Sequence, residues 1–173
     1  MNKLKFATVA LSMFVLGLMI PLQKRNPSPC KLCLDRDTIL MTDPPSLQMY
    51  FCIEKYAEMY NIPKRFAYGI AYAETRYKGP FDWDYDHAQT SSAGAVGPMQ
   101  IMPRYADPYV DEDKWTTHDL KTNIEMNVKA SMRILRKLHN MHKDWKLVFG
   151  AYNTGKPCIN SYAETVYEYK PNW

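Results

Sequence analysis

The sequence predicts a mainly α-helical single domain of about six helices with little or no sheet, preceded by an apolar N-terminal segment. Apolar residues recur at helical spacing in several stretches, no stretch alternates between apolar and polar residues around hairpin turns, and no internal repeat is found. The chain has 173 residues, of which 46% are hydrophobic. This is enough for one domain with a core of its own.

The residues before this domain divide into two parts. Residues 1–22 combine a basic start with a long apolar run, which is typical of either a cleaved signal peptide or a retained N-terminal membrane anchor. Residues 23–45 contain four prolines and are expected to form an extended linker. We therefore expect an exported protein whose domain occupies residues 46–173.

The four cysteines are candidates for disulfide bonds, because an exported protein lies in an oxidising compartment. They are Cys30, Cys33, Cys52 and Cys158. Four cysteines allow three pairings, and the sequence does not choose among them. Cys30 and Cys33 form a Cys-x-x-Cys pair, for which a redox or metal motif is the alternative interpretation.

Charge and motifs exclude several classes of function. The formal net charge is +4, and the sequence has no basic stripe with interleaved aromatic residues, so no nucleic-acid partner is expected. Glycine patterns for nucleotide binding and the zinc-protease pattern are missing, and the four histidines are scattered. No cofactor and no metal are expected.

Two helices are expected at the start of the domain, over residues 46–60 and 63–77, separated by a break before Pro63. In the second helix Ala67, Ile70 and Glu74 share one face, so Glu74 lies on the apolar side. A carboxyl group in such a place is partly desolvated, which raises its pKa towards the value that a general acid needs. The alternative interpretation is an ion pair with a nearby Lys or Arg.

A turn-rich region follows the glutamate. Residues 78–90 form an aromatic-rich loop in which Asp82, Asp84 and Asp86 alternate with aromatic residues. Alternating aspartates can bind Ca²⁺, but the glycine and the distal glutamate of an EF-hand loop are missing. Residues 91–103 are expected to make tight turns at Gly94 and Gly97.

The rest of the domain is expected to be helical, with one polar loop over residues 107–118. A short helix is predicted over residues 98–105, a long one over 121–142, a shorter one over 145–152 and a last one over 159–169. The long helix carries an apolar stripe that is expected to face the core: Ile124, Val128, Met132, Leu135 and Leu138. The sequence Asn153-Thr154-Gly155 is a typical helix end.

Four motifs, in this order, resemble those of the soluble lytic transglycosylases, which share the lysozyme-like fold with goose-type lysozyme. Residues 74–77 resemble the family's E-S-x-F motif, and residues 92–103 resemble S-x-G-A-x-G-L-M-Q-I-M-P, with Pro98 in place of Leu. Residues 127–135 are similar to N-I-x-x-G-x-x-Y-L, with Ser131 for Gly and Ile134 for Tyr. Residues 151–155 resemble A-Y-N-A-G.

The resemblance implies cleavage of the β-1,4 bond between N-acetylmuramic acid and N-acetylglucosamine in peptidoglycan. In this family one glutamate, here Glu74, serves as acid and then as base, and the product carries a 1,6-anhydromuramic end. A tyrosine near the C-terminus approaches the glutamate in the family, and Tyr167 or Tyr169 is the candidate here. The other residues implied to contact or orient the substrate are Ser92, Gly97, Met99, Gln100, Tyr152 and Asn153.

One departure from the family pattern leaves two alternatives open. The interval between Glu74 and Ser92 is longer than usual and holds the three aspartates. A goose-type hydrolase uses aspartates near this region to hold a water molecule, so hydrolysis is one alternative. An inactive wall-binding module is the other. The expected settings are a bacterial envelope enzyme, a component of a secretion or conjugation apparatus, and a phage virion protein.

Overall fold

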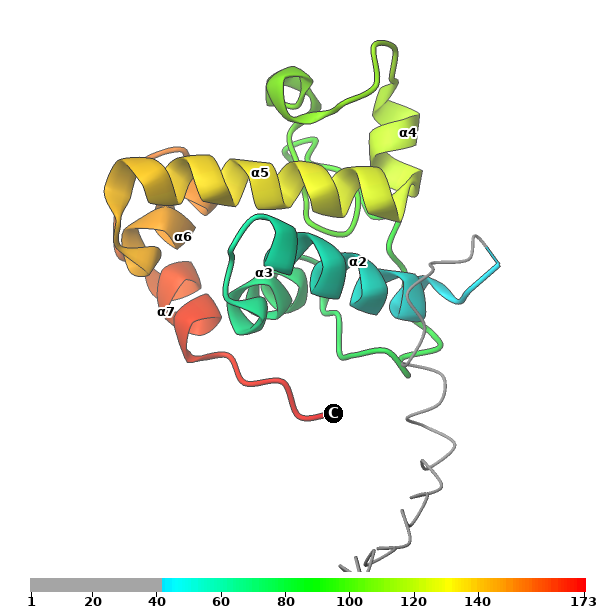
Figure 1. Cartoon of the computed structure of the whole chain (residues 1–173), viewed down its shortest axis with the longest axis horizontal. Helices are drawn as coiled ribbons and strands as arrows, with labels where there is room; N and C mark the ends of the chain where they lie inside the picture. Colours follow the sequence, from blue (N-terminus) through cyan, green and yellow to red (C-terminus); the bar gives the residue numbers. More distant parts are fainter. Residues whose placement is uncertain (1–41) are drawn as a thin grey trace, which may run out of the picture.

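The computed structural model describes residues 42–173, and within them the chain is mainly α-helical, as the sequence predicts (Figure 1). Two isolated β-bridges, Thr90 to Val96 and Val96 to Ile101, are the only extended pairing in this part. The helices in chain order are α2 (Pro45–Met59), α3 (Lys64–Thr75), η1 (Pro103–Tyr105), η2 (Asp107–Tyr109), α4 (Thr117–Thr122), α5 (Ile124–His142), α6 (Trp145–Thr154) and α7 (Ser161–Glu168).

The N-terminal predictions fall outside the described residues. These are the signal peptide or anchor over residues 1–22, nearly all of the 23–45 linker, and the cysteines Cys30 and Cys33. In residues 42–173 no helix is long and apolar enough to cross a membrane. Cys52 and Cys158 are not bonded to each other: Cys52 is buried on α2, and Cys158 lies in the segment before α7.

Helix α5 is the centre of the packing. Its predicted apolar stripe is buried except for the half-buried Leu138, and Val128, Met132 and Leu135 are fully buried. Helix α5 packs against both α2 and α6. Figure 1 shows α5 crossing over α2 and α3, with α4 and the green segment just before it on its opposite side. Helix α7 packs against α6 and α3, and α2 packs against α3 as well. The first and the last helix of the described domain therefore both contact α3.

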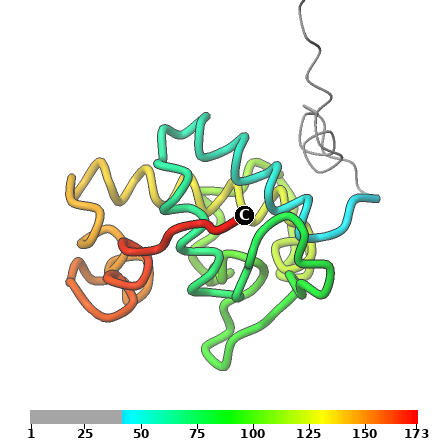
Figure 2. The backbone as a smooth tube through the Cα atoms, turned by 90° about the horizontal axis from the view of Figure 1, so that it is seen from below, coloured from blue at the N-terminus to red at the C-terminus, as the bar shows by residue number. Residues whose placement is uncertain are grey.

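The C-terminal tail closes over α3 and the loop that follows it. After α7 the chain runs back across the middle of the domain (Figure 2). The ring of Trp173 packs edge-on against Tyr68, with ring centroids 5.2 Å apart. A side chain at Gly79, where φ is +119°, would lie 2.6 Å from the Trp173 ring. A glycine is therefore required there for the tail to dock.

The expected elements differ from the structure in the middle of the chain. The short helix predicted over residues 98–105 is limited to the 3-10 turn η1, and the loop predicted over 107–118 contains η2 and the start of α4. Thr116 and Asp119 form a reciprocal capping box that starts α4. The long helix begins at Ile124 instead of residue 121, because the Asn123 side chain caps α5 by accepting the Met126 N–H at 3.0 Å.

Candidate active site

Glu74 lies in the last turn of α3, on the side that faces α7. The helix ends at Thr75 because Arg76 takes a left-handed conformation with φ +62°. A Cβ atom at Gly69 would lie 2.8 Å from the Val166 carbonyl oxygen, so this glycine lets α7 pack closely on α3. The close packing brings the Tyr162 hydroxyl to Glu74, where it donates a hydrogen bond to Oε1 at 2.6 Å.

Burial has the largest effect on the pKa of Glu74. Desolvation of the carboxyl group raises its pKa to about 7, against the smaller opposite effect of the Tyr162 hydrogen bond. Burial and the nearby Glu74 also raise the pKa of Tyr162 well above its usual value, so its hydroxyl stays a donor. In residues 42–173 no Lys or Arg forms an ion pair with Glu74. The structure thus favours the general acid over the structural ion pair.

The loop 91–103 forms the wall next to Glu74, and a buried amide fixes its shape. Asn127 on α5 is fully buried. Its Nδ2 donates to the Val96 carbonyl at 3.0 Å and to the Leu120 carbonyl at 2.9 Å, and its Oδ1 accepts the Met99 N–H at 2.9 Å. One side chain therefore holds the loop, the end of α4 and α5 together.

Two further hydrogen bonds attach this loop to α3 and to α6. The Thr75 hydroxyl, next to Glu74 in the chain, donates to the Pro98 carbonyl at 2.9 Å. The Tyr152 hydroxyl on α6 donates to the Met99 carbonyl at 2.7 Å. Two consecutive carbonyl groups are thus held from opposite sides. The relative position of Glu74, the loop and α6 is set by neutral hydrogen bonds in a largely buried place.

A groove of about 550 Å³ lies between this loop, η2, α5 and α6. Gln100, Tyr152 and Asn153 line it, together with Tyr109 of η2 and Leu138 of α5. The nearby charge of Glu74 contributes, after burial, to raising the pKa of Tyr152. Glu74 thus acts electrostatically on a residue of the groove wall, although it does not itself line the groove.

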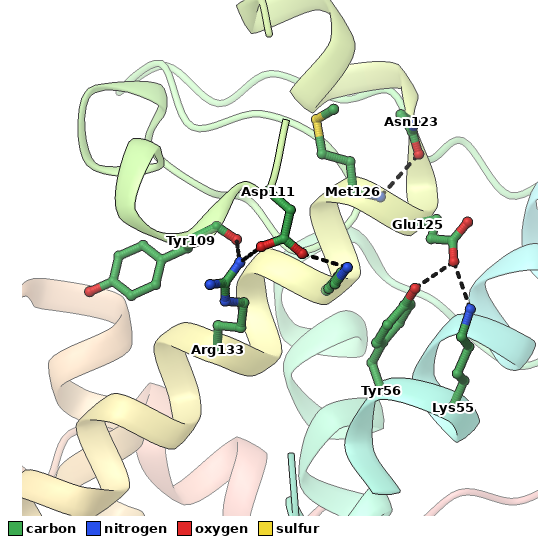
Figure 3. A network of polar contacts seen from close by, with 9 residues as sticks. Lys55, Tyr56, Tyr109, Asp111, Asn123, Glu125, Met126 and Arg133 are labelled. Atoms are coloured by element: carbon green, nitrogen blue, oxygen red, sulfur yellow. Dashed lines mark hydrogen bonds and ion pairs between the residues drawn. The ribbon is translucent and has the colours of Figure 1, made fainter. Parts of the chain in front are cut away.

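Partly exposed charges attach η2, which carries Tyr109 of the groove, to α5, and Figure 3 shows this network. Arg133 on α5 donates to the Tyr109 carbonyl at 3.0 Å and also contacts the Asp111 carboxylate. Lys129 forms a second ion pair with Asp111 at 2.5 Å. These contacts attach η2, and with it the Tyr109 side chain, to the surface of α5.

The structure brings together only some of the predicted substrate residues. Gln100, Tyr152 and Asn153 line the groove, whereas Ser92 is exposed beside it. Gly97 and Met99 are buried. They shape the loop through their backbones and do not present a side chain to the groove. Their assignment as substrate-contacting residues stays a prediction.

The tyrosine that contacts Glu74 is Tyr162, and not Tyr167 or Tyr169 as the resemblance suggested. Tyr167 stacks on Phe66, with ring centroids 5.6 Å apart. Tyr169 stacks on Tyr72 at 5.0 Å. A signal for Tyr162 was present in the sequence, because it lies four residues before Val166, on the face that α7 buries.

The three aspartates after Glu74 lie apart from the groove. Asp84 and Asp86 are exposed, and the Asp86 carboxylate accepts the Ala88 N–H at 2.9 Å within its own loop. None of the three lines the groove. In the described part of the chain no three His, Cys, Asp or Glu side chains are placed to hold a metal ion.

A comparison with protein-family models matches residues 51–172 to the model described as "Transglycosylase SLT domain". The matched residues run from the first turns of α2 to the C-terminal tail. They include Glu74, the loop 91–103, Tyr152 and Tyr162. A search among curated proteins finds no match.

We predict that Gly97→Ala destabilises the domain more than Gly94→Ala does. Both glycines have positive φ, +76° and +88°, so both variants carry the same backbone strain. A Cβ at position 97 would lie 2.4 Å from Asn127 Nδ2, whereas nothing lies within 4 Å at position 94. We expect an additional loss of about 1–3 kcal/mol for Gly97→Ala, measured by urea unfolding. Equal losses of unfolding free energy in the two variants would show that the close contact with Asn127 does not destabilise Gly97→Ala.

We also predict that Glu74→Gln stabilises the fold in a pH-dependent way. The pKa of Glu74 is raised in the folded state, so the carboxyl contributes stability below its unfolded value of 4.5 and loses it as pH rises through about 7. The amide avoids this loss, so the variant should gain about 1–3 kcal/mol at pH 8 and little at pH 4. Thermal unfolding across this range measures the gain.

The control is Glu125→Gln, since Tyr56 and Lys55 lower the pKa of Glu125. Its carboxylate contributes stability above its unfolded pKa, so that variant should lose about 0–1 kcal/mol at neutral pH. A loss of stability in Glu74→Gln at pH 8 would contradict the assignment of Glu74 as a desolvated acid.

Proposed function

Because the chain belongs to the transglycosylase SLT domain family and is a lytic transglycosylase acting on peptidoglycan, we propose that Glu74 is its single acid and base. The observation that carries this proposal is the environment of Glu74. The carboxyl is partly buried, and its pKa is raised to about 7. A group with this pKa can both donate and accept a proton near neutral pH.

In the proposed reaction Glu74 first protonates the glycosidic oxygen between N-acetylmuramic acid and N-acetylglucosamine. The bond between this oxygen and C1 of the muramic ring breaks. The C6 hydroxyl of the same ring then forms a bond to C1 and returns its proton to Glu74. The product is a 1,6-anhydromuramic end, and no water is consumed.

The neighbouring residues support these steps through position. Tyr162 holds the carboxyl in one orientation and stabilises its charged form after the first proton transfer. Gln100 and Asn153 present amide groups to the groove, and these suit the hydroxyl and acetamido groups of the sugars. The side chain of Gln100 is held in place, because its Nε2 donates a hydrogen bond to the Gly97 carbonyl at 2.9 Å.

The surroundings of Glu74 support transglycosylation over the hydrolytic alternative. A hydrolase with a second carboxylate needs that group close to the reacting sugar. Burial and Tyr162 set the pKa of Glu74, and no aspartate of the 82–86 loop contributes to it. The Asp86 carboxylate instead accepts a hydrogen bond from the Ala88 N–H of its own loop.

We further propose that the enzyme acts outside the cytoplasmic membrane. Its substrate lies there, and the apolar residues 4–22 suit either a cleaved signal or an anchor facing the periplasm or cell wall. A bacterial envelope, a secretion or conjugation apparatus and a phage virion are the settings that fit such an enzyme.

We predict that digestion of purified peptidoglycan releases muropeptides with anhydromuramic ends, identified by mass spectrometry. The isosteric Glu74→Gln variant should lose about 10²-fold or more of this activity, because proton transfer is removed. Its folded state is checked by circular dichroism. Reducing ends, heavier by one water, would show hydrolysis instead. Binding to cell wall without release would indicate the inactive module.

We predict that Tyr162→Phe moves the alkaline limb of the pH–rate profile upward. Activity should fall as pH rises through about 7, since the first step needs protonated Glu74. The Tyr162 hydrogen bond lowers the pKa of Glu74, so its removal should raise this pKa further. The matched control is Tyr167→Phe on the same helix, which should leave the limb in place. A downward shift in Tyr162→Phe would contradict the assignment.

A further inference from the structure

A second groove, of about 470 Å³, lies next to the substrate groove across the Tyr109 side chain. Tyr109 lines both. Helix α5 contributes to both as well: Ile134 and Leu138 face the first groove, and Arg133 and Lys137, each one residue earlier, face the second. The two grooves therefore adjoin at Tyr109.

The second groove is positively charged. None of its lining residues is acidic, and three are cations: Arg133, Arg136 and Lys137. Arg133 is engaged with Asp111 and the Tyr109 carbonyl. Arg136 and Lys137 have no ion pair with an acidic side chain in residues 42–173. Two cations in a shallow, open site are thus available to an anionic ligand.

Both cations lie close to a neighbouring ring, Lys137 to Tyr109 and Arg136 to His139. Lys137 Nζ lies 5.4 Å from the centroid of the Tyr109 ring, which places the ammonium group at the boundary between the two grooves. After burial, the charges of Arg136 and Lys143 contribute to lowering the pKa of His139. Arg136 and Lys137 thus lie close together near the C-terminal end of α5.

We propose that this basic groove, formed by Arg136, Lys137 and Tyr109, binds the free carboxylates of the peptide stem of peptidoglycan. The inference rests on the proposed function, in which the sugars lie in the substrate groove. Each muramic acid carries a peptide on its lactyl group, and such peptides bear free carboxylates. An extended peptide covers about 3.3–3.6 Å per residue, so a stem of several residues can extend from one groove into the adjoining one.

The first test measures binding in the absence of cleavage. A soluble stem tripeptide with free carboxylates is titrated into the Glu74→Gln protein and followed by NMR chemical shifts. The same titration uses the protein that also carries Arg136→Gln and Lys137→Gln. We expect saturable shifts around α5 and Tyr109, an affinity about three- to tenfold weaker in the groove variant, and little binding of the amidated tripeptide.

A matched control removes two positive charges elsewhere, through Lys114→Gln and Lys170→Gln, which lie on exposed parts outside both grooves. Equal weakening in this control would reduce the effect to net charge and overturn the proposal. Equal binding of the amidated peptide would overturn it too. A poly(glycerol phosphate) chain that binds more tightly, and is weakened by the same variant, would assign the groove to wall phosphate polymers instead.

The second test measures cleavage. The ratio of kcat/KM on intact peptidoglycan to kcat/KM on glycan strands stripped of their peptides should fall about three- to tenfold in Arg136→Gln/Lys137→Gln. An unchanged ratio would overturn the proposal, because the two cations would then make no contribution to recognition of the peptide. Absence of activity in the unmodified enzyme on both substrates would refute the proposed function alone, since the tripeptide titration assesses the groove independently.

Discussion

The arrangement of this domain depends on how the carbonyl groups of residues 98 and 99 are held. One is held by Thr75, the residue after Glu74, and the other by Tyr152 of α6. The buried Asn127 amide fixes the backbone between them from α5. A polar group in such a dry place is costly when it is left unpaired. The loop therefore has one favourable arrangement, and α3, α5 and α6 are aligned to it.

Unlike these paired carbonyl groups, Glu74 lies where burial makes its charged form unfavourable. Its carboxyl is held where the charged form is disfavoured, and the fold provides one neutral donor, Tyr162, instead of a cation. An ion pair would stabilise the charged form and lower the pKa, and the group would then be a poor acid at neutral pH. Ionised Glu74 thus costs the fold stability, as linkage of a raised pKa to folding requires. Strongly shifted pKa values of this kind are concentrated at catalytic sites, which supports the acid–base role proposed for Glu74.

The sequence predicts the helices that carry strong apolar periodicity, and it places Glu74 on the buried face of α3. It does not predict α4, because the Thr116–Asp119 capping box is a short polar signal without a periodic stripe. It also misplaces the tyrosine opposite Glu74. Helical spacing to Val166 places Tyr162 on the buried face of α7. The close approach of α7 to α3 at Gly69, which accompanies the contact of its hydroxyl with Glu74, is a tertiary contact that local patterns do not encode.

The segments that line the groove are fixed by different forces. Neutral hydrogen bonds hold the loop next to Glu74, and dissolved ions hardly affect them. The segment that carries Tyr109 is attached through Asp111 to Lys129 and Arg133, whose charges are partly exposed. Mobile ions screen such charges. A rise in ionic strength should therefore weaken the attachment of η2 to α5 well before it affects the hydrogen bonds beside Glu74.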